Sequence, residues 1–137
     1  MRDIDGAIST LTDRECWQML REAPVGRLAL SAGSDIDIFP VTFRVDGQSL
    51  YFRTSPGLKL AEVGIRSRVT LEVDGYDDAT AWSVVAKGSG RHLNSVAELD
   101  IAAELRLTTW LPTPTPDVVR IDVESLSGRR FSRATWR

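Results

Sequence analysis

Short segments rich in apolar residues, with turn-forming residues between them, most restrict how this chain of 137 residues can fold. In the clearest segment, Val69, Leu71 and Val73 alternate with polar residues, which gives a β-strand one apolar and one polar face. Residues 46–49, Asp-Gly-Gln-Ser, are typical of a hairpin turn. We predict six strands, at Arg27 to Ser31, Ile36 to Val45, Leu50 to Thr54, Val69 to Asp74, Trp82 to Gly88 and Val118 to Leu126. Strands this short that follow one another through turns favour a mainly β, six-stranded antiparallel barrel over a doubly wound parallel sheet.

Three segments are predicted to form helices. In the first, Thr12 and Glu15 have the spacing of a capping box, and Pro24 followed by Gly26 ends the helical run. The three predicted helices are Thr12 to Glu22, Pro56 to Ile65 and Ser95 to Leu107. Because no repeat, low-complexity tract or long linker interrupts the sequence, residues 1–137 are expected to form a single domain.

Composition and charge exclude several classes of protein. Hydrophobic residues make up 42% of the chain and charged residues 26%, which is the profile of one soluble globular domain. Seventeen basic and 19 acidic residues give a net charge of -2, which excludes the broad basic surface of a nonspecific nucleic-acid binder. No apolar run approaches the roughly 20 residues of a membrane helix, and the N-terminus lacks a signal-peptide pattern, so we expect a cytoplasmic protein. A single cysteine and a single histidine exclude an intrachain disulfide and a multi-histidine metal site.

The segment from Arg53 to Lys59 has the composition of a phosphate site. Arg53 and Thr54 end a predicted strand, and Ser55 and Gly57 lie where the next helix would begin. The free backbone N–H groups of a helix N-terminus attract anions, and a guanidinium, a hydroxyl and the Lys59 ammonium would add to that attraction. The alternative is an ordinary strand-to-helix turn with solvated charges.

The predicted strand from Ile36 to Val45 changes the parity of its apolar residues. Ile36 and Ile38 occupy even positions, whereas Val41 and Val45 occupy odd ones. A bulge or bend at Pro40 would reverse the inward face at this point. Because proline has no N–H for a strand ladder, the backbone beside it could face a planar ligand. The alternative is a bulge that only lets a barrel close.

Three further features of the sequence bear on chemistry: the pair Ser83 and Lys87, His92, and Cys16. Ser83 and Lys87 share one face of a predicted strand and could project together toward a polar ligand. The alternative is that Trp82 belongs to the core while Lys87 extends from a sheet edge. His92 has no acidic or nucleophilic neighbour in sequence and is interpreted as a surface or barrel-end residue. Cys16 lies on the apolar side of the first helix, which indicates a packing role.

The order of these segments resembles the pyridoxamine 5'-phosphate oxidase-like, FMN-binding split-barrel proteins, from Leu11 to about Phe131. The resemblance rests on the runs Pro40-Val41-Thr42-Phe43, residues 50–61 (LYFRTSPGLKLA), residues 69–76 (VTLEVDGY), residues 82–88 (WSVVAKG) and residues 127–131 (SGRRF). It implies a six-stranded split barrel that forms a homodimer, with one FMN in each of two clefts at the interface.

The resemblance also implies roles for individual residues. The residues implied to hold the FMN phosphate are Arg53, Thr54 and Lys59. Those implied to line the isoalloxazine edge, through backbone and hydroxyl groups, are Pro40, Val41 and Thr42. Those implied to flank the ring or lie near it are Trp82, Ser83, Val84 and Lys87, with Trp110 as a contact from the other subunit.

The expected function is therefore a flavin-dependent oxidoreductase that transfers hydride between FMN and a small planar substrate, without nucleic-acid or membrane partners. No catalytic residue is nominated, because the cofactor carries this chemistry. The chain departs from the true pyridoxamine phosphate oxidases, because its ending, residues 132–137 (SRATWR), lacks their arginine-rich C-terminal segment. One alternative is a reductase of the same fold that uses the deazaflavin coenzyme F-420, whose acidic tail would need cations such as Arg129 and Arg130. Another is a noncatalytic flavin-binding module.

Overall fold

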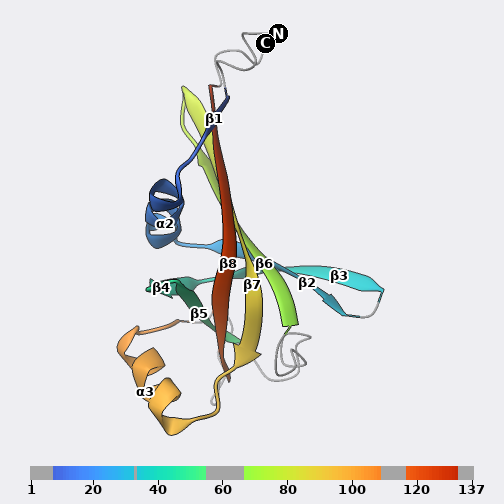
Figure 1. The fold of residues 1–137 in the computed structure, drawn as a ribbon, viewed down its shortest axis with the longest axis vertical. Coiled ribbons are helices and arrows are strands. Elements are labelled where there is room, and N and C mark those ends of the chain that lie inside the picture. Colours follow the sequence, from blue (N-terminus) through green and yellow to red (C-terminus); the bar gives the residue numbers. More distant parts are fainter. Residues whose placement is uncertain (1–7, 33, 55–66, 109–116, 133–137) are drawn as a thin grey trace.

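The computed structural model describes residues 8–32, 34–54, 67–108 and 117–132. Within these residues, eight strands form one antiparallel sheet in the order β3-β2-β6-β7-β8-β5-β4, and β1 pairs with the far end of β8 (Figure 1). The strands are β1 (Ile8–Thr10), β2 (Gly26–Ala32), β3 (Asp35–Val41), β4 (Phe43–Asp46), β5 (Ser49–Thr54), β6 (Ser67–Tyr76), β7 (Thr80–His92) and β8 (Asp117–Ser132). The helices are α2 (Asp13–Glu22) and α3 (Val96–Glu104).

The mainly β, antiparallel fold class is confirmed, while the strand count differs from the prediction. β1 adds a strand that the sequence did not reveal, and the segment predicted as one strand from Ile36 to Val45 divides into β3 and β4. β7 and β8, with 13 and 16 residues, are also much longer than predicted. Two predicted helices are confirmed as α2 and α3, and the third, Pro56 to Ile65, lies outside the described residues.

The predicted change of parity at Pro40 is wrong. Ile36 and Ile38 are 74% and 66% exposed, so they point away from the core. Val41 and Phe43, at odd positions, are buried. Odd positions therefore face inward throughout, and Pro40 stays in register opposite a residue of β2. Because β3 ends the strand order, it pairs with β2 alone, and an edge strand of this kind tolerates a residue without an N–H.

The strand is interrupted at Thr42 instead, and this interruption is where the sheet closes into a barrel. β3 and β4 stand at opposite ends of the strand order, yet Thr42 alone separates them in the chain. One residue can join the two ends only if the sheet curls back on itself, which produces a split barrel. The predicted hairpin between β4 and β5 is confirmed, because Asp46 pairs with Ser49, and Gly47 supplies the positive φ of +61° that a tight hairpin turn needs.

Helix α2 packs against β8, β4 and β7. Its predicted capping box is present: Glu15 N–H donates to Thr12 Oγ1 (3.2 Å), and Thr12 N–H donates to Glu15 Oε1 (2.9 Å). Cys16 and Leu20 on its inner side pack into the core cluster. A side chain at Gly128 of β8 would lie 2.7 Å from Cys16 Sγ, so only glycine lets the helix approach this closely.

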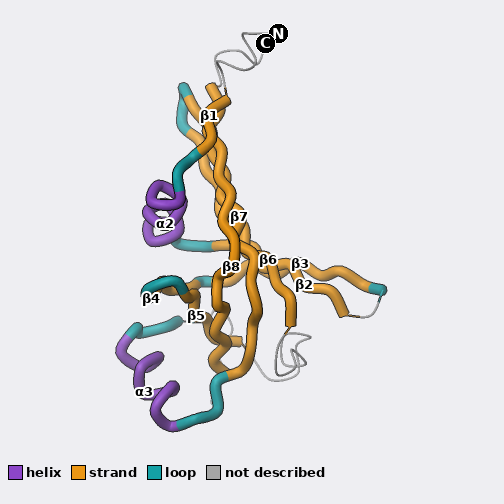
Figure 2. Tube along the Cα trace, in the orientation of Figure 1, coloured by secondary structure: helices purple, strands orange, loops and turns teal. Residues whose placement is uncertain are grey.

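A second apolar cluster lies beneath α3 and fixes the segment that follows this helix. Its buried members are Tyr51, Leu93, Ala102, Leu107 and Val118. An ion pair between Arg91 of β7 and Glu98 of α3 adds a polar link. Figure 2 shows both helices on one side of the molecule, with the β2–β3 hairpin projecting on the other. Within the described ranges, neither helix is long and apolar enough to cross a membrane.

Candidate functional site

Two polar atoms at the end of β5 are buried without a hydrogen-bond partner in the described structure: Arg53 Nε and Thr54 Oγ1. Thr54 is only 3% exposed. The comparison with Ser49, at the other end of the same strand, is direct, because Ser49 is also buried but donates to Asp122 Oδ1 (3.0 Å). Buried polar atoms are nearly always hydrogen-bonded, so Arg53 and Thr54, which we call the anchor pair, are candidates to bind a polar ligand.

Thr42 lies beside the anchor pair. Phe43 pairs with Phe52, so the next position back along the chain, Thr42, falls next to Arg53. The Thr42 hydroxyl donates to the carbonyl oxygen of Thr108 (3.1 Å) and lies 3.2 Å from the Thr108 hydroxyl. Val41 is buried, so only its backbone could face a ligand. Three of the predicted residues, Thr42, Arg53 and Thr54, are therefore brought together.

Trp82 and Pro40 line a different cleft, of about 690 Å³, which we call the tryptophan cleft. Trp82 pairs with Gly75 of β6 and Arg130 of β8. A side chain at Gly75 would lie 2.6 Å from the Trp82 ring, so glycine is needed where the ring crosses the strand. The cleft is lined by Met19, Glu22, Ala23, Pro24, Val25, Arg27, Pro40, Val73, Asp74, Asp77, Thr80, Trp82 and Arg130.

The anchor pair and Trp82 lie toward opposite ends of β8. Arg53 pairs with Val118 and Trp82 pairs with Arg130, twelve positions farther along the strand. At the rise of an extended strand, this separation is roughly 40 Å along β8. Figure 1 shows β8 running nearly straight along the length of the sheet. One chain therefore does not gather all the predicted residues around a single place.

The remaining predicted residues occupy other positions. Ser83 pairs with Asp74 and Arg129 and is partly exposed, whereas the side chain of Val84 is fully buried in the core. Lys87 is exposed and lines a separate hollow of about 310 Å³ on the outer face of the sheet, next to a register shift between β7 and β8. Lys59 and Trp110 lie outside the described residues.

Carboxylates and arginines form a network at the tryptophan cleft. Arg27 Nη1 contacts Glu72 Oε1 (2.8 Å) and Asp74 Oδ2 (2.7 Å), and these contacts raise the pKa of Arg27. Burial, together with the neighbouring Asp74, raises the pKa of Glu72. Arg130 lies 3.9 Å from Glu15 at its nearest ion-pair contact. Positive and negative groups therefore share this cleft.

Cys16 has the surroundings that the sequence predicted, and His92 has the predicted position but also an acidic neighbour that the sequence did not reveal. His92 ends β7, and its Nδ1 lies 3.9 Å from Asp117 Oδ2, so it is a barrel-end residue. Cys16 is 1% exposed, and burial raises the pKa of its thiol. A thiol held neutral in the core is a poor nucleophile, which supports a packing role.

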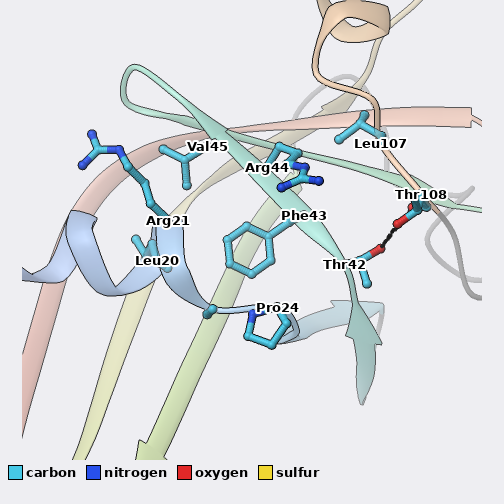
Figure 3. A pocket seen from close by; sticks show the side chains of 10 residues that line it. Leu20, Arg21, Pro24, Thr42, Phe43, Arg44, Val45, Leu107 and Thr108 are labelled. Carbon is cyan, nitrogen blue, oxygen red and sulfur yellow. Dashed lines mark hydrogen bonds between the residues drawn. The ribbon is translucent and has the colours of Figure 1, made fainter.

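Sequence reasoning missed a third cleft, of about 360 Å³, between α2, β4 and the segment after α3 (Figure 3). We call it the arginine cleft, because Arg21 and Arg44 lie in its lining. The other lining residues are Leu20, Ala23, Pro24, Thr42, Phe43, Val45, Leu107 and Thr108. Its residues come from three separate stretches of sequence, 20–24, 42–45 and 107–108, so no local motif could have revealed it.

Both the sequence and the fold of this chain are similar to those of known proteins. The family model for pyridoxamine 5'-phosphate oxidase matches residues 12–130. A candidate pyridoxamine 5'-phosphate oxidase from Corynebacterium glutamicum has 33% identity and a TM-score of 0.83, over 91% of this chain and 98% of that one. The FAD binding protein from Mycobacterium smegmatis has 32% identity and a TM-score of 0.81, over 90% and 98% of the two chains.

A conserved protein of unknown function from Corynebacterium diphtheriae is also similar, with 37% identity and a TM-score of 0.78, over 91% of this chain and 98% of that one. The resemblance found in the sequence is thus confirmed by a match over most of the chain and by structures that share its fold. The chain therefore belongs to the pyridoxamine 5'-phosphate oxidase family.

Proposed function

We propose that this protein is a flavin-dependent oxidoreductase whose anchor pair, Arg53 and Thr54, binds the flavin phosphate. The observation that carries the proposal is the pair of buried polar atoms without a partner at the end of β5. A phosphate oxygen would accept hydrogen bonds from both side chains and so remove the cost of leaving them unbonded. Membership of the family, and a relative named as an FAD binding protein, support a flavin as the ligand.

The residues of this chain would bind and orient the cofactor. Flavins, when bound, supply hydride transfer, so the protein needs no acid or base of its own for that step. Arg53 would supply the positive charge opposite the phosphate. The backbone of Thr42, beside Arg53, would contact the edge of the flavin ring. Lys59, carried over from the family resemblance, would add a second cation.

We also propose that a second copy of the chain completes the site. The anchor pair and Trp82 pair at opposite ends of β8, so Trp82 and Ser83 of one copy would flank a flavin held by the anchor pair of the other. The exposed Ile36 and Ile38 on β3 support such an association, because a soluble chain gains when a partner covers adjacent apolar side chains. The whole protein would then be a symmetric homodimer with two flavin sites.

FMN remains the first candidate cofactor, and FAD is the second, because the Mycobacterium smegmatis relative is named for FAD. The deazaflavin coenzyme is the third candidate. Its acidic tail continues from the phosphate, whereas Arg129 and Arg130 pair with Ser83 and Trp82 at the ring end of the proposed site, so the structure does not favour these two cations as partners of that tail. Parallel titrations of the purified protein with FMN, FAD and the deazaflavin coenzyme distinguish the three.

The anchor is tested by Arg53→Ala. Loss of a charge-assisted contact worth about 1.5–3 kcal/mol should weaken FMN binding roughly 10- to 150-fold. Arg68→Ala is the matched control, because Arg68 is an exposed arginine that pairs with Glu124 on the outer face of the sheet. Quenching of flavin fluorescence on binding gives the dissociation constants. Equal affinities in both variants would contradict the anchor, and failure of the wild-type protein to bind any of the three cofactors would overturn the proposed function.

Activity is tested separately from binding. The flavin-loaded protein is photoreduced without oxygen and mixed with menadione, a planar quinone, while absorbance near the flavin band is followed. An oxidoreductase should return to the oxidised spectrum faster than free reduced flavin at the same concentration. Stoichiometric flavin with no such acceleration, for menadione and for nitroaromatic acceptors, would favour the noncatalytic flavin-binding module.

A further inference from the structure

We propose that the arginine cleft binds a planar aromatic molecule that carries an anionic group, such as an aromatic carboxylate, and that this molecule is the substrate of the proposed flavin site. The substrate role rests on the proposed function, whereas the binding chemistry rests only on the lining of the cleft.

The floor of the cleft suits a flat apolar ring. Leu20, Phe43 and Leu107 are 1%, 7% and 7% exposed and belong to the packed interior, so they offer a fixed apolar surface. Figure 3 shows the Phe43 ring in the middle of this surface, between α2 and the segment that carries Leu107. The volume of about 360 Å³ lies in the range of small-molecule sites and exceeds what one or two fused aromatic rings need.

The charges of the cleft select an anion. Among the described residues, the ten that line the cleft include no acidic side chain, although the chain has 19 acidic residues. Arg21 comes from α2 and Arg44 from β4, and within the described residues neither forms an ion pair. The tryptophan cleft differs in this respect, because Glu22 and Asp74 lie beside its arginines. An anion is thus favoured in the arginine cleft over a neutral molecule of the same shape.

The position of the cleft places its ligand beside the proposed flavin site. Thr42 lines the cleft and also adjoins Arg53 of the anchor pair. Its hydroxyl bonds with Thr108 fix the wall between β4 and the segment after α3. A planar molecule that packs on Phe43 would therefore lie next to Thr42, the residue whose backbone we propose to lie at the edge of the flavin ring.

The test compares benzoate with benzamide, which has the same ring and shape but no charge. Both are titrated into the isotopically labelled wild-type protein, and binding is followed by amide chemical shifts of Thr42 and Val45. Benzoate should bind more tightly, and its advantage should shrink as salt rises from 50 to 500 mM. Equal binding of the two probes, or shifts elsewhere only, would overturn the proposal.

Three variants locate the charge that selects benzoate. Arg21→Gln and Arg44→Gln should each weaken benzoate binding roughly two- to fivefold, the range of partly exposed charge pairs, and leave benzamide unchanged. Arg14→Gln is the matched control, because Arg14 is an exposed arginine of the same helix that does not line this cleft. If the control weakens benzoate as much as the other two, the charge is general to the surface and the site is wrong.

The same titration in flavin-loaded protein identifies the source of the anion. If FMN leaves benzoate binding intact, the cleft is free for a separate substrate. If FAD blocks benzoate binding and FMN does not, the adenylate half of FAD occupies the cleft. This result would support the proposed binding of an anion and would contradict the substrate role. Flavin affinity is also measured in the double variant Arg21→Gln/Arg44→Gln and in Arg53→Ala. The comparison of these two affinities distinguishes a failure of the arginine cleft from a failure of the flavin anchor.

Discussion

At the scale of single residues, the informative contrast is between two buried hydroxyl side chains on β5. Ser49 is bonded to Asp122, whereas the Thr54 hydroxyl has no partner. Thr54→Val keeps the shape of the side chain and removes the unbonded oxygen. We expect this change to raise the free energy of unfolding of the flavin-free protein by about 1 kcal/mol, because the desolvation cost disappears.

The same variant should weaken FMN binding by roughly two- to tenfold, since a neutral hydrogen bond to the phosphate is lost. The stability of the flavin-free protein and its affinity for FMN would thus change in opposite directions, as expected for a residue whose role is to bind a ligand. Urea denaturation and fluorescence titration measure the two quantities. Thr70→Val, at a partly exposed position in β6, controls for the greater β-propensity of valine. A less stable flavin-free Thr54→Val protein would contradict the interpretation.

Sequence patterns predicted local contacts at this scale and missed those that depend on distant strands. The capping box of Thr12 and Glu15 follows from their spacing alone. Arg53 and Thr54 were singled out by residue type, but their burial depends on pairing with β8, more than 60 residues away in the chain. The direction of Ile36 and Ile38 was predicted wrongly for a related reason. Apolar character indicates an inward face only where the strand has a core behind it.

At the scale of elements, the link between α3 and the sheet should depend on pH. The hydrogen bond and ion pair with Arg91 hold the pKa of Glu98 below its usual value. A carboxyl whose pKa is lowered by folding stabilises the folded state above its unfolded pKa, and this contribution is lost as pH falls through the folded value. We therefore expect α3 to loosen as pH falls below about 4.5.

The measurement is amide hydrogen exchange across α3, expressed as protection factors at several pH values. Protection of residues near Leu105 should fall with pH in the wild-type protein and should be low and independent of pH in Glu98→Gln. Glu104→Gln is the control, because Glu104 lies on the same helix and has no ion pair in the described structure. Protection in Glu98→Gln that still varies with pH like the wild type would contradict this role.

Most element positions could be predicted because alternation and caps are local signals. The division of the strand at Thr42 could not be predicted from the sequence. Before this residue the chain pairs with β2, and after it the chain pairs with β5, and this change of partner depends on the closure of the whole sheet. The lengths of β7 and β8 were underestimated for a similar reason. Partner strands extend them through residues that have little apolar alternation of their own.

At the scale of the whole molecule, two variants test whether each flavin site is shared between copies. Arg53→Ala removes the anchor, and Trp82→Ala removes the proposed ring contact. If one chain holds the complete site, mixing the two variants restores nothing. If the anchor and the tryptophan come from different copies, a mixed dimer has one site with both residues intact and one site that lacks both.

Subunit exchange between equal amounts of the two variants should make about half of the dimers mixed, so about one quarter of all sites should regain wild-type affinity. Fluorescence titration at an FMN concentration that saturates the wild type but neither variant counts these sites, and sedimentation velocity confirms that dimers persist. The control is a mixture of Arg53→Ala with Arg53→Ala/Trp82→Ala, which cannot regenerate an intact site in either arrangement. Recovery above this control would require the two ends of β8 to act on one flavin from opposite copies. No recovery from freely exchanging dimers would place Trp82 outside the flavin site and leave the tryptophan cleft as a separate feature of each chain.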